Sequence, residues 1–95
     1  MSDANSQRRS LPFERVTIED SFWAPRMQAN RQSGLEAVYQ QLASTGRLDA
    51  YDLDWMPGSD RPQPHVFWDS DVAKWLEGVC YSLINHPDAE LCEKV

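Results

Sequence analysis

The 95-residue sequence has few cysteines, few basic residues and no long apolar run, and each shortage excludes a class of protein. Only two cysteines, Cys80 and Cys92, are present, so a disulfide framework is excluded and a reducing compartment fits. Nine Lys and Arg stand against fifteen Asp and Glu, a formal charge of −6, which leaves no basic face for binding phosphates. No window approaches the ~20 apolar residues of a membrane span, and no signal peptide is evident. We therefore expect a cytoplasmic protein that binds neither nucleic acid nor a membrane.

The chain is long enough for one small domain. Residues 1–14 are mostly polar and follow no pattern, so we expect a flexible N-terminal tail. Val16 and Ile18 then alternate with polar residues, which predicts a short, half-buried extended segment. Such a segment is brief enough to form only an edge strand.

A first helix is predicted over about residues 24–44. Asp20 or Ser21 can cap its start. Gly46 is a typical end signal, because glycine enters the left-handed cap conformation without strain. The apolar stripe consists of Met27, Leu35, Val38 and Leu42, and its interruptions are Arg31 and Gly34.

Residues 47–66 are predicted to form a loop without regular structure, because they hold three prolines, one glycine and four aspartates. A loop of this length in a compact domain is typically functional or is held by another part of the protein. Asp49, Asp52 and Asp54 do not indicate a calcium-binding EF-hand, since the glycine and the closing glutamate of that motif are missing.

The second helix is the clearest element, because its apolar positions follow the helical period without a gap. Asp69 or Ser70 can accept hydrogen bonds from the free N–H groups at its start, and Asp71 favours the positive end of the helix dipole. The helix is predicted to end at residues 85–87, because the residue before a proline is pushed out of the helical region. The apolar stripe consists of Val72, Trp75, Leu76, Val79, Cys80 and Leu83.

Asp88 is expected to cap a third, short helix on which Leu91 and Val95 lie four residues apart. The sequence supplies no further element for this helix to pack on, so we expect an incomplete domain, truncated at its C-terminal end. The apolar stripe of residues 72–83 is then left uncovered, and it forms an aggregation-prone patch when the chain is isolated.

Two carboxylates and three aromatic residues surround the start of the second helix. Asp69 and Asp71 are the type of pair that serves acid–base chemistry in sugar hydrolysis, but capping and dipole roles are favoured, since helical residues two apart point to different sides. Trp75 is assigned to the core because it lies on the stripe. Phe67 and Trp68 precede the helix and fit core packing and sugar stacking equally well.

Gly78 and the histidine and cysteine side chains are expected to have structural roles and not to bind a ligand or a metal. Gly78 lies away from the apolar stripe, and close packing of a neighbouring helix is favoured over a ligand at its backbone. His65, His86, Cys80 and Cys92 supply suitable atoms for zinc, but their spacings match no metal motif, so we expect no metal site and no cofactor in this segment. Cys80 is expected to pack in the core.

Three stretches taken together resemble the N-terminal part of the family 127 glycoside hydrolases, the β-L-arabinofuranosidase-like enzymes. The stretches are VTIEDSFWAPRMQANR, QLASTGRLDAY and HVFWDSDVAKWLEGVCYSLINHPDAEL. The most specific block runs from Phe67 to Glu77, and the resemblance extends from about Val16 to the last residue.

The resemblance implies an all-α fold, in which this chain forms the first helices of an (α/α)6 barrel that is followed by β-sandwich domains. In that family the nucleophile is thought to be a zinc-bound cysteine thiolate, with a glutamate as the acid/base. No position of this sequence matches those residues, and Cys80 and Cys92 are not the family's cysteines. We therefore expect no catalytic and no metal-binding residue here; zinc is implied only for the full-length family.

The resemblance further implies that residues 15–95 are the N-terminal part of a catalytic domain acting on β-L-arabinofuranosides or related carbohydrates, and that this chain alone is inactive. Phe67 and Trp68 are expected to line the sugar site, and Asp69 to hydrogen-bond a sugar hydroxyl or the loop that holds it. One alternative is a small helical interaction module that grips a partner helix with the 72–83 stripe. Another is carbohydrate binding retained without catalysis.

Overall fold

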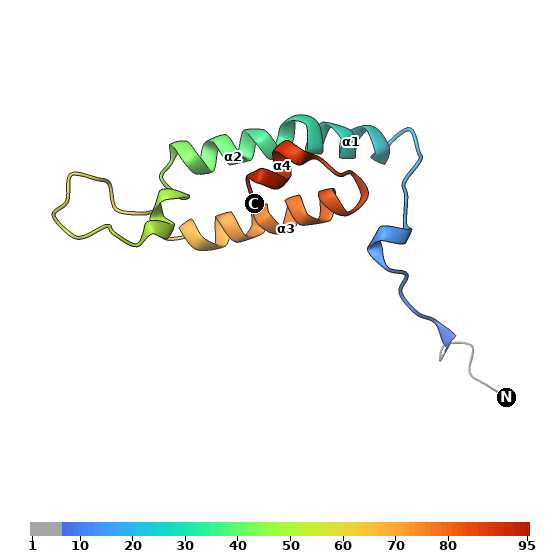
Figure 1. The fold of residues 1–95 in the computed structure, drawn as a ribbon, viewed down its shortest axis with the longest axis horizontal. Helices are drawn as coiled ribbons and strands as arrows, with labels where there is room; N and C mark the ends of the chain where they lie inside the picture. The colour runs from blue at the N-terminus through green and yellow to red at the C-terminus, as the bar shows by residue number, and fades with distance from the viewer. Residues whose placement is uncertain (1–6) are drawn as a thin grey trace.

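The computed structural model describes residues 7–95, and helices are the only regular elements within that range (Figure 1). The first six residues of the predicted tail lie outside the described residues. The main elements are the 3-10 turn Phe13–Arg15, α1 (Trp23–Ala29), the π-helical segment Asn30–Gly34, α2 (Leu35–Ser44), the 3-10 turn Asp49–Asp52, α3 (Trp68–Asn85) and α4 (Ala89–Glu93). The predicted all-α class is confirmed.

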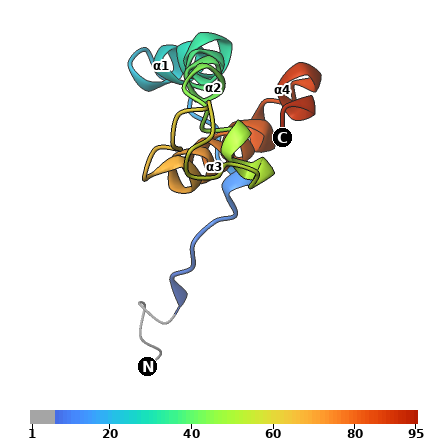
Figure 2. The same ribbon diagram turned by 90° about the vertical axis from the view of Figure 1, so that its left-hand side faces the viewer.

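The helices form two antiparallel rows with a short helix beside them. α1 and α2 follow one another along the first row, and α3 runs back alongside them (Figure 1). In the end-on view, α1 and α2 overlap above α3, while α4 lies to one side (Figure 2). The loop between α2 and α3 projects from one end of this arrangement, so the start of α3 lies at the base of that loop.

The predicted extended segment is present at Val16, whose backbone has φ −111° and ψ 124°, but it has no partner strand within residues 7–95. Val16 and Ile18 are 42% and 43% exposed. The segment is attached to α3 instead: the Phe13 ring lies 5.2 Å from the ring of Tyr81, and Nδ2 of Asn85 donates to the carbonyl of Val16 at 3.3 Å. Its extended backbone is therefore held by a helix and not by a sheet.

The ends of the first helical row are defined by the residues that the sequence indicated. The Asp20 carboxylate accepts hydrogen bonds from the backbone N–H groups of Trp23 and Ala24 at 2.7 and 2.8 Å. At the other end Gly46 has φ +78°, and the N–H of Arg47 donates to the carbonyl of Leu42 at 3.0 Å. This is the Schellman arrangement, which satisfies carbonyls that the helix itself leaves free.

The π-helical segment Asn30–Gly34 interrupts the predicted helix where Arg31 and Gly34 break its apolar stripe. Of the stripe residues that follow this segment, Leu35 and Leu42 are buried as expected, but Val38 is 47% exposed. Tyr39 packs against the core instead, because it lies four residues after Leu35 and three before Leu42 on the same face of α2.

The core lies between α2, α3 and α4, and Trp75 is at its centre. The Trp75 side chain is 5% exposed, its Nε1–H donates to the carbonyl of Leu35 at 2.8 Å, and its ring lies 5.2 Å from that of Tyr39. Burying a large apolar side chain in this way contributes about 1.5–3 kcal/mol. The buried cluster consists of Leu35, Leu42, Val72, Trp75, Val79 and Leu91.

This core corrects two predictions about α3. The loop of residues 45–67 reverses the chain, so that α3 packs against α2 and α4 and its 72–83 stripe is covered. The predicted exposed patch is therefore absent, and Val79 is fully buried. Cys80 is exposed and does not pack in the core.

α4 packs on the rest of the chain, although the sequence offered no obvious element for it. Asp88 caps it as predicted by accepting a hydrogen bond from the N–H of Leu91 at 3.1 Å, and Leu91 is buried in the core.

An ion pair also ties the C-terminal end of the chain to α2, since Lys94 lies 3.2 Å from the Glu36 carboxylate. Hydrogen bonds from Gln40 and Lys94 lower the pKa of Glu36, and Glu36 raises the pKa of Lys94, so both groups are charged around neutral pH. Val95 is 58% exposed.

Two glycine substitutions are expected to change stability in opposite directions. Gly46→Ala should lower the free energy of unfolding by about 1 kcal/mol, because an L-residue is strained at φ +78°. Gly78→Ala is the matched control inside α3. An added Cβ there would lie 3.9 Å from Cδ2 of Leu35, an ordinary contact, so alanine should raise the free energy by up to about 1 kcal/mol. Urea denaturation followed by circular dichroism measures both changes, and a Gly46→Ala variant at least as stable as the unmodified chain would contradict the cap assignment.

Candidate functional site

Phe67, Trp68 and Asp69, the predicted sugar-binding residues, lie together where the loop between α2 and α3 enters α3 (Figure 1). Phe67 immediately precedes the helix and is 57% exposed. Its backbone N–H donates to Nδ1 of His65 at 3.1 Å, and the two rings lie 5.6 Å apart. The Phe67 ring therefore contributes little to the core and is open to a ligand.

Trp68 is half-buried and is held by Tyr51, a residue that the sequence did not single out. The two rings meet edge to face, with centroids 4.7 Å apart and planes at 84°. The Tyr51 hydroxyl donates to the backbone carbonyl of Asp69 at 3.0 Å. Tyr51 thus joins the 3-10 turn Asp49–Asp52 to the first turn of α3 and fixes the orientation of the Trp68 indole.

The two carboxylates at the start of α3 have separate partners. The Asp69 carboxylate accepts a hydrogen bond from the backbone N–H of Ser70 at 2.8 Å, one of the free N–H groups of the first turn, and Asp69 is exposed. Asp71 is less exposed, and its Oδ2 pairs with Nε of Arg47 at 2.7 Å. The capping role predicted for Asp69 or Ser70 is wrong, because α3 already begins at Trp68, its N-cap residue is Phe67 and no side chain caps it. Asp71 ties the segment that follows α2 to α3.

The loop itself carries a second aromatic residue, Trp55, whose Nε1–H donates to the carbonyl of Arg61 at 3.0 Å. Trp55, His65 and Trp68 together line a hollow of about 570 Å³ at the start of α3. The length of this loop favours either a functional role or contact with another part of the protein, but periodicity carries no information on which loop residues fold back beside the helix. The site is therefore an aromatic hollow whose lining also includes Gln63 and His65, a combination that suits a neutral polyhydroxyl ligand.

No metal chemistry is assigned to this site. Within the part of the chain that the structure describes, no three His, Cys, Asp or Glu side chains lie close enough together to hold a metal ion. Cys80 and Cys92 are exposed free thiols. These residues do not fit the zinc site that the resemblance implies for the full-length family. Among residues 7–95, every helix falls short of the length and apolarity that a membrane crossing requires.

Comparison with known proteins gives one match. The family model described as "Beta-L-arabinofuranosidase, GH127 catalytic domain" matches residues 15–95, a range that includes α1 to α4 and the whole aromatic hollow. No curated protein and no solved structure matches the chain.

Neutralising the two carboxylates one at a time is expected to separate their roles. Asp71→Asn should lower the free energy of unfolding by about 1 kcal/mol, because it removes a short, partly buried ion pair with Arg47. Asp69→Asn should change it by less than about 0.5 kcal/mol, since the amide oxygen still accepts the N–H of Ser70. Urea denaturation of both variants is the measurement. A larger loss for Asp69→Asn would show that the Asp69 carboxylate, and not the ion pair, holds the start of α3.

Proposed function

Since the chain belongs to the family of β-L-arabinofuranosidase catalytic domains, glycoside hydrolase family 127, we propose that it forms the first helices of an (α/α)6 barrel and one wall of its sugar-binding pocket. The substrate class is a terminal β-L-arabinofuranoside or a related carbohydrate. On this proposal the chain binds sugar at the start of α3 and does not cleave it alone.

The observation that carries the proposal is the aromatic hollow at the start of α3, inside the matched range. Trp68 offers a flat apolar face that Tyr51 holds in place, and Phe67 offers a second face that is 57% exposed. Aromatic faces of this kind pack against the C–H side of a sugar ring. The Asp69 carboxylate is exposed beside them and has acceptor capacity beyond its bond to Ser70, so it can receive a sugar hydroxyl.

The arrangement of the helices supports the barrel part of the proposal. The α1–α2 row and α3 form an antiparallel pair, which is the repeating unit of a barrel made of paired helices (Figure 2). Apolar side chains remain exposed on the outer sides of this pair: Trp23, Val38, Tyr81 and Ile84. These sides are surfaces on which further helices of the domain would pack.

The reacting groups belong, on this proposal, to other parts of the catalytic domain. These groups are the nucleophilic cysteine, the acid/base glutamate and the metal ligands that the family implies. What residues 7–95 do is bind and orient the sugar. The alternative role as a helical interaction module has no support, because α2 and α4 already occupy the 72–83 stripe.

A sugar titration tests the proposed function. The ¹⁵N-labelled chain is titrated with methyl β-L-arabinofuranoside, and the largest NMR shift changes are expected at the amides of Phe67, Trp68 and Asp69 and at the Trp68 indole. Asp69→Asn should weaken binding several-fold, because a carboxylate is the stronger acceptor for a hydroxyl. Chromatography of the mixture should show no released arabinose.

Asp60→Asn serves as the matched control, since Asp60 is an exposed loop aspartate outside the hollow. It should leave the sugar affinity unchanged. Shift changes confined to other regions, equal effects of the two substitutions, or hydrolysis of the sugar by this chain alone would each contradict the proposal.

A further inference from the structure

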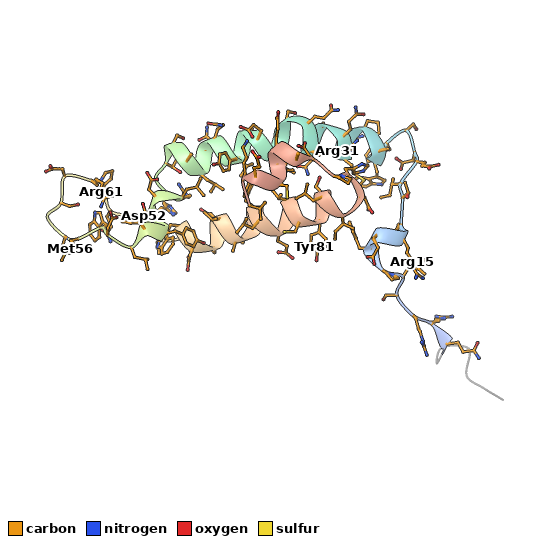
Figure 3. The ribbon with its side chains drawn as sticks, viewed as in Figure 1. Arg15, Arg31, Asp52, Met56, Arg61 and Tyr81 are labelled. Atoms are coloured by element: carbon orange, nitrogen blue, oxygen red, sulfur yellow. The ribbon has the colours of Figure 1, made fainter. Side chains whose placement is uncertain are left out.

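A hollow of about 420 Å³ lies at the end of the helical pair opposite to the aromatic hollow of the proposed sugar site. It opens between α1 and the C-terminal half of α3, whereas the loop with Asp52 and Arg61 projects from the other end (Figure 3). Its lining combines three aromatic side chains with two arginines: Phe13, Trp23, Tyr81, Arg26 and Arg31. None of these five residues takes part in the proposed binding of sugar.

The aromatic side chains of this hollow are held in place but remain accessible. Phe13, Trp23 and Tyr81 are 45%, 57% and 49% exposed. The ring of Phe13 lies 5.2 Å from that of Tyr81, and the ring of Trp23 meets that of Phe22 edge to face, with centroids 4.8 Å apart. Accessible aromatic rings whose positions are already fixed favour contact with an apolar group.

The two arginines have different surroundings. Arg26 is attached to its own helix, because its Nη1 donates to the carbonyl of Phe22 at 2.7 Å and its guanidinium carbon lies 3.6 Å from the centre of the Phe22 ring. Arg31 is half-buried, and within residues 7–95 its side chain forms no ion pair and no hydrogen bond. A guanidinium that is partly withdrawn from water without an acceptor favours the approach of a carboxylate.

The hollow also lacks negative charge, although the chain as a whole carries a formal charge of −6. Among the Asp, Glu, Lys and Arg residues of the described chain, only the two arginines line it. Asp20 lines an adjoining hollow of about 270 Å³ that Arg31 also borders. Its carboxylate accepts the N–H groups of Trp23 and Ala24 and forms no ion pair with Arg31. The charge that complements Arg31 is therefore one that residues 7–95 do not supply.

We propose that this hollow is a docking site for an α-helix that carries a glutamate or an aspartate among apolar side chains. The carboxylate of that helix pairs with Arg31, and its apolar side chains pack on Trp23 and Tyr81. A helix fits because α1 and α3 form the two walls, and an amphipathic helix packs its apolar stripe into the groove between two helices. The inference rests on the barrel part of the proposed function and adds the charge that a helix covering this side carries.

Two helical peptides of about 18 residues test the proposal. Each has a leucine stripe and no charge, except that one peptide carries a single glutamate at the centre of the stripe and the other a glutamine. Both are titrated into the ¹⁵N-labelled chain. The glutamate peptide should shift the Trp23 indole signal and the Arg31 Nε–H signal. It should bind about tenfold more tightly than the glutamine peptide, because a charge-assisted hydrogen bond is the stronger one.

Arg31→Gln in the chain should lower the affinity for the glutamate peptide to that for the glutamine peptide, and should leave the glutamine peptide unaffected. Arg15→Gln is the matched control. Arg15 is an exposed arginine near the same end of the molecule but lines neither hollow, so its loss changes the net charge equally (Figure 3). It should leave both affinities unchanged. The comparison of the two peptides needs no variant, so it stays decisive if Arg31→Gln alters the fold.

Three results would overturn the inference. The first is equal affinity of the two peptides, or an equal effect of Arg15→Gln and Arg31→Gln. The second is dimerisation of the chain in sedimentation runs that Arg31→Gln abolishes, which would assign the hollow to a second copy. The third is binding of phenylacetate as tight as that of the glutamate peptide, which would assign the hollow to a small organic acid. The sugar titration reports on Phe67, Trp68 and Asp69 at the other end of the molecule, so a failure of the proposed sugar binding is distinguished from a failure here.

Discussion

The burial of Trp75 between α2 and α3 is the contact on which the rest of this structure depends. Its ring packs on Tyr39, its Nε1–H reaches the Leu35 carbonyl, and the α3 residues on either side of it, Val72 and Val79, are buried with it. Trp75 lies two helical turns from Trp68, a distance of roughly 10 Å along a rigid helix. Fixing the middle of α3 in the core therefore also fixes the start of α3, where the aromatic hollow lies.

The hollow is completed by links between the loop and the first turn of α3. Arg47 pairs with Asp71, and the Tyr51 hydroxyl reaches the carbonyl of Asp69, so the beginning of the loop is tied to the helix at two successive points. Beyond these links the loop carries Trp55 back over the helix start. A long proline-containing segment thus acquires a defined shape from side-chain contacts together with the backbone hydrogen bonds of its turns.

Local signals in the sequence predicted the helix ends well. Asp20, Gly46 and Asp88 occupy the cap positions expected of them, because capping depends on residues only a few positions apart. Periodicity placed Val38 on the apolar stripe, whereas Tyr39, which shares a helix face with the buried Leu35 and Leu42, packs against the core. It also failed at Cys80, since the width of a buried face depends on how many neighbours cover it. The roles of Tyr51 and Trp55 arise from contacts between loop and helix, which no local pattern encodes.

The chain belongs to the family of β-L-arabinofuranosidase catalytic domains, and it combines a helical core with an exposed aromatic hollow. The most direct test of this account is amide hydrogen exchange on the chain, resolved by residue. The account predicts that the amides of α2 and of Val72 to Leu83 exchange slowest and share one opening free energy, because they open only when the Trp75 core is lost. Amides in residues 53–66 should exchange much faster. Exchange of α3 as fast as that of the loop, or different opening free energies for α2 and α3, would contradict it.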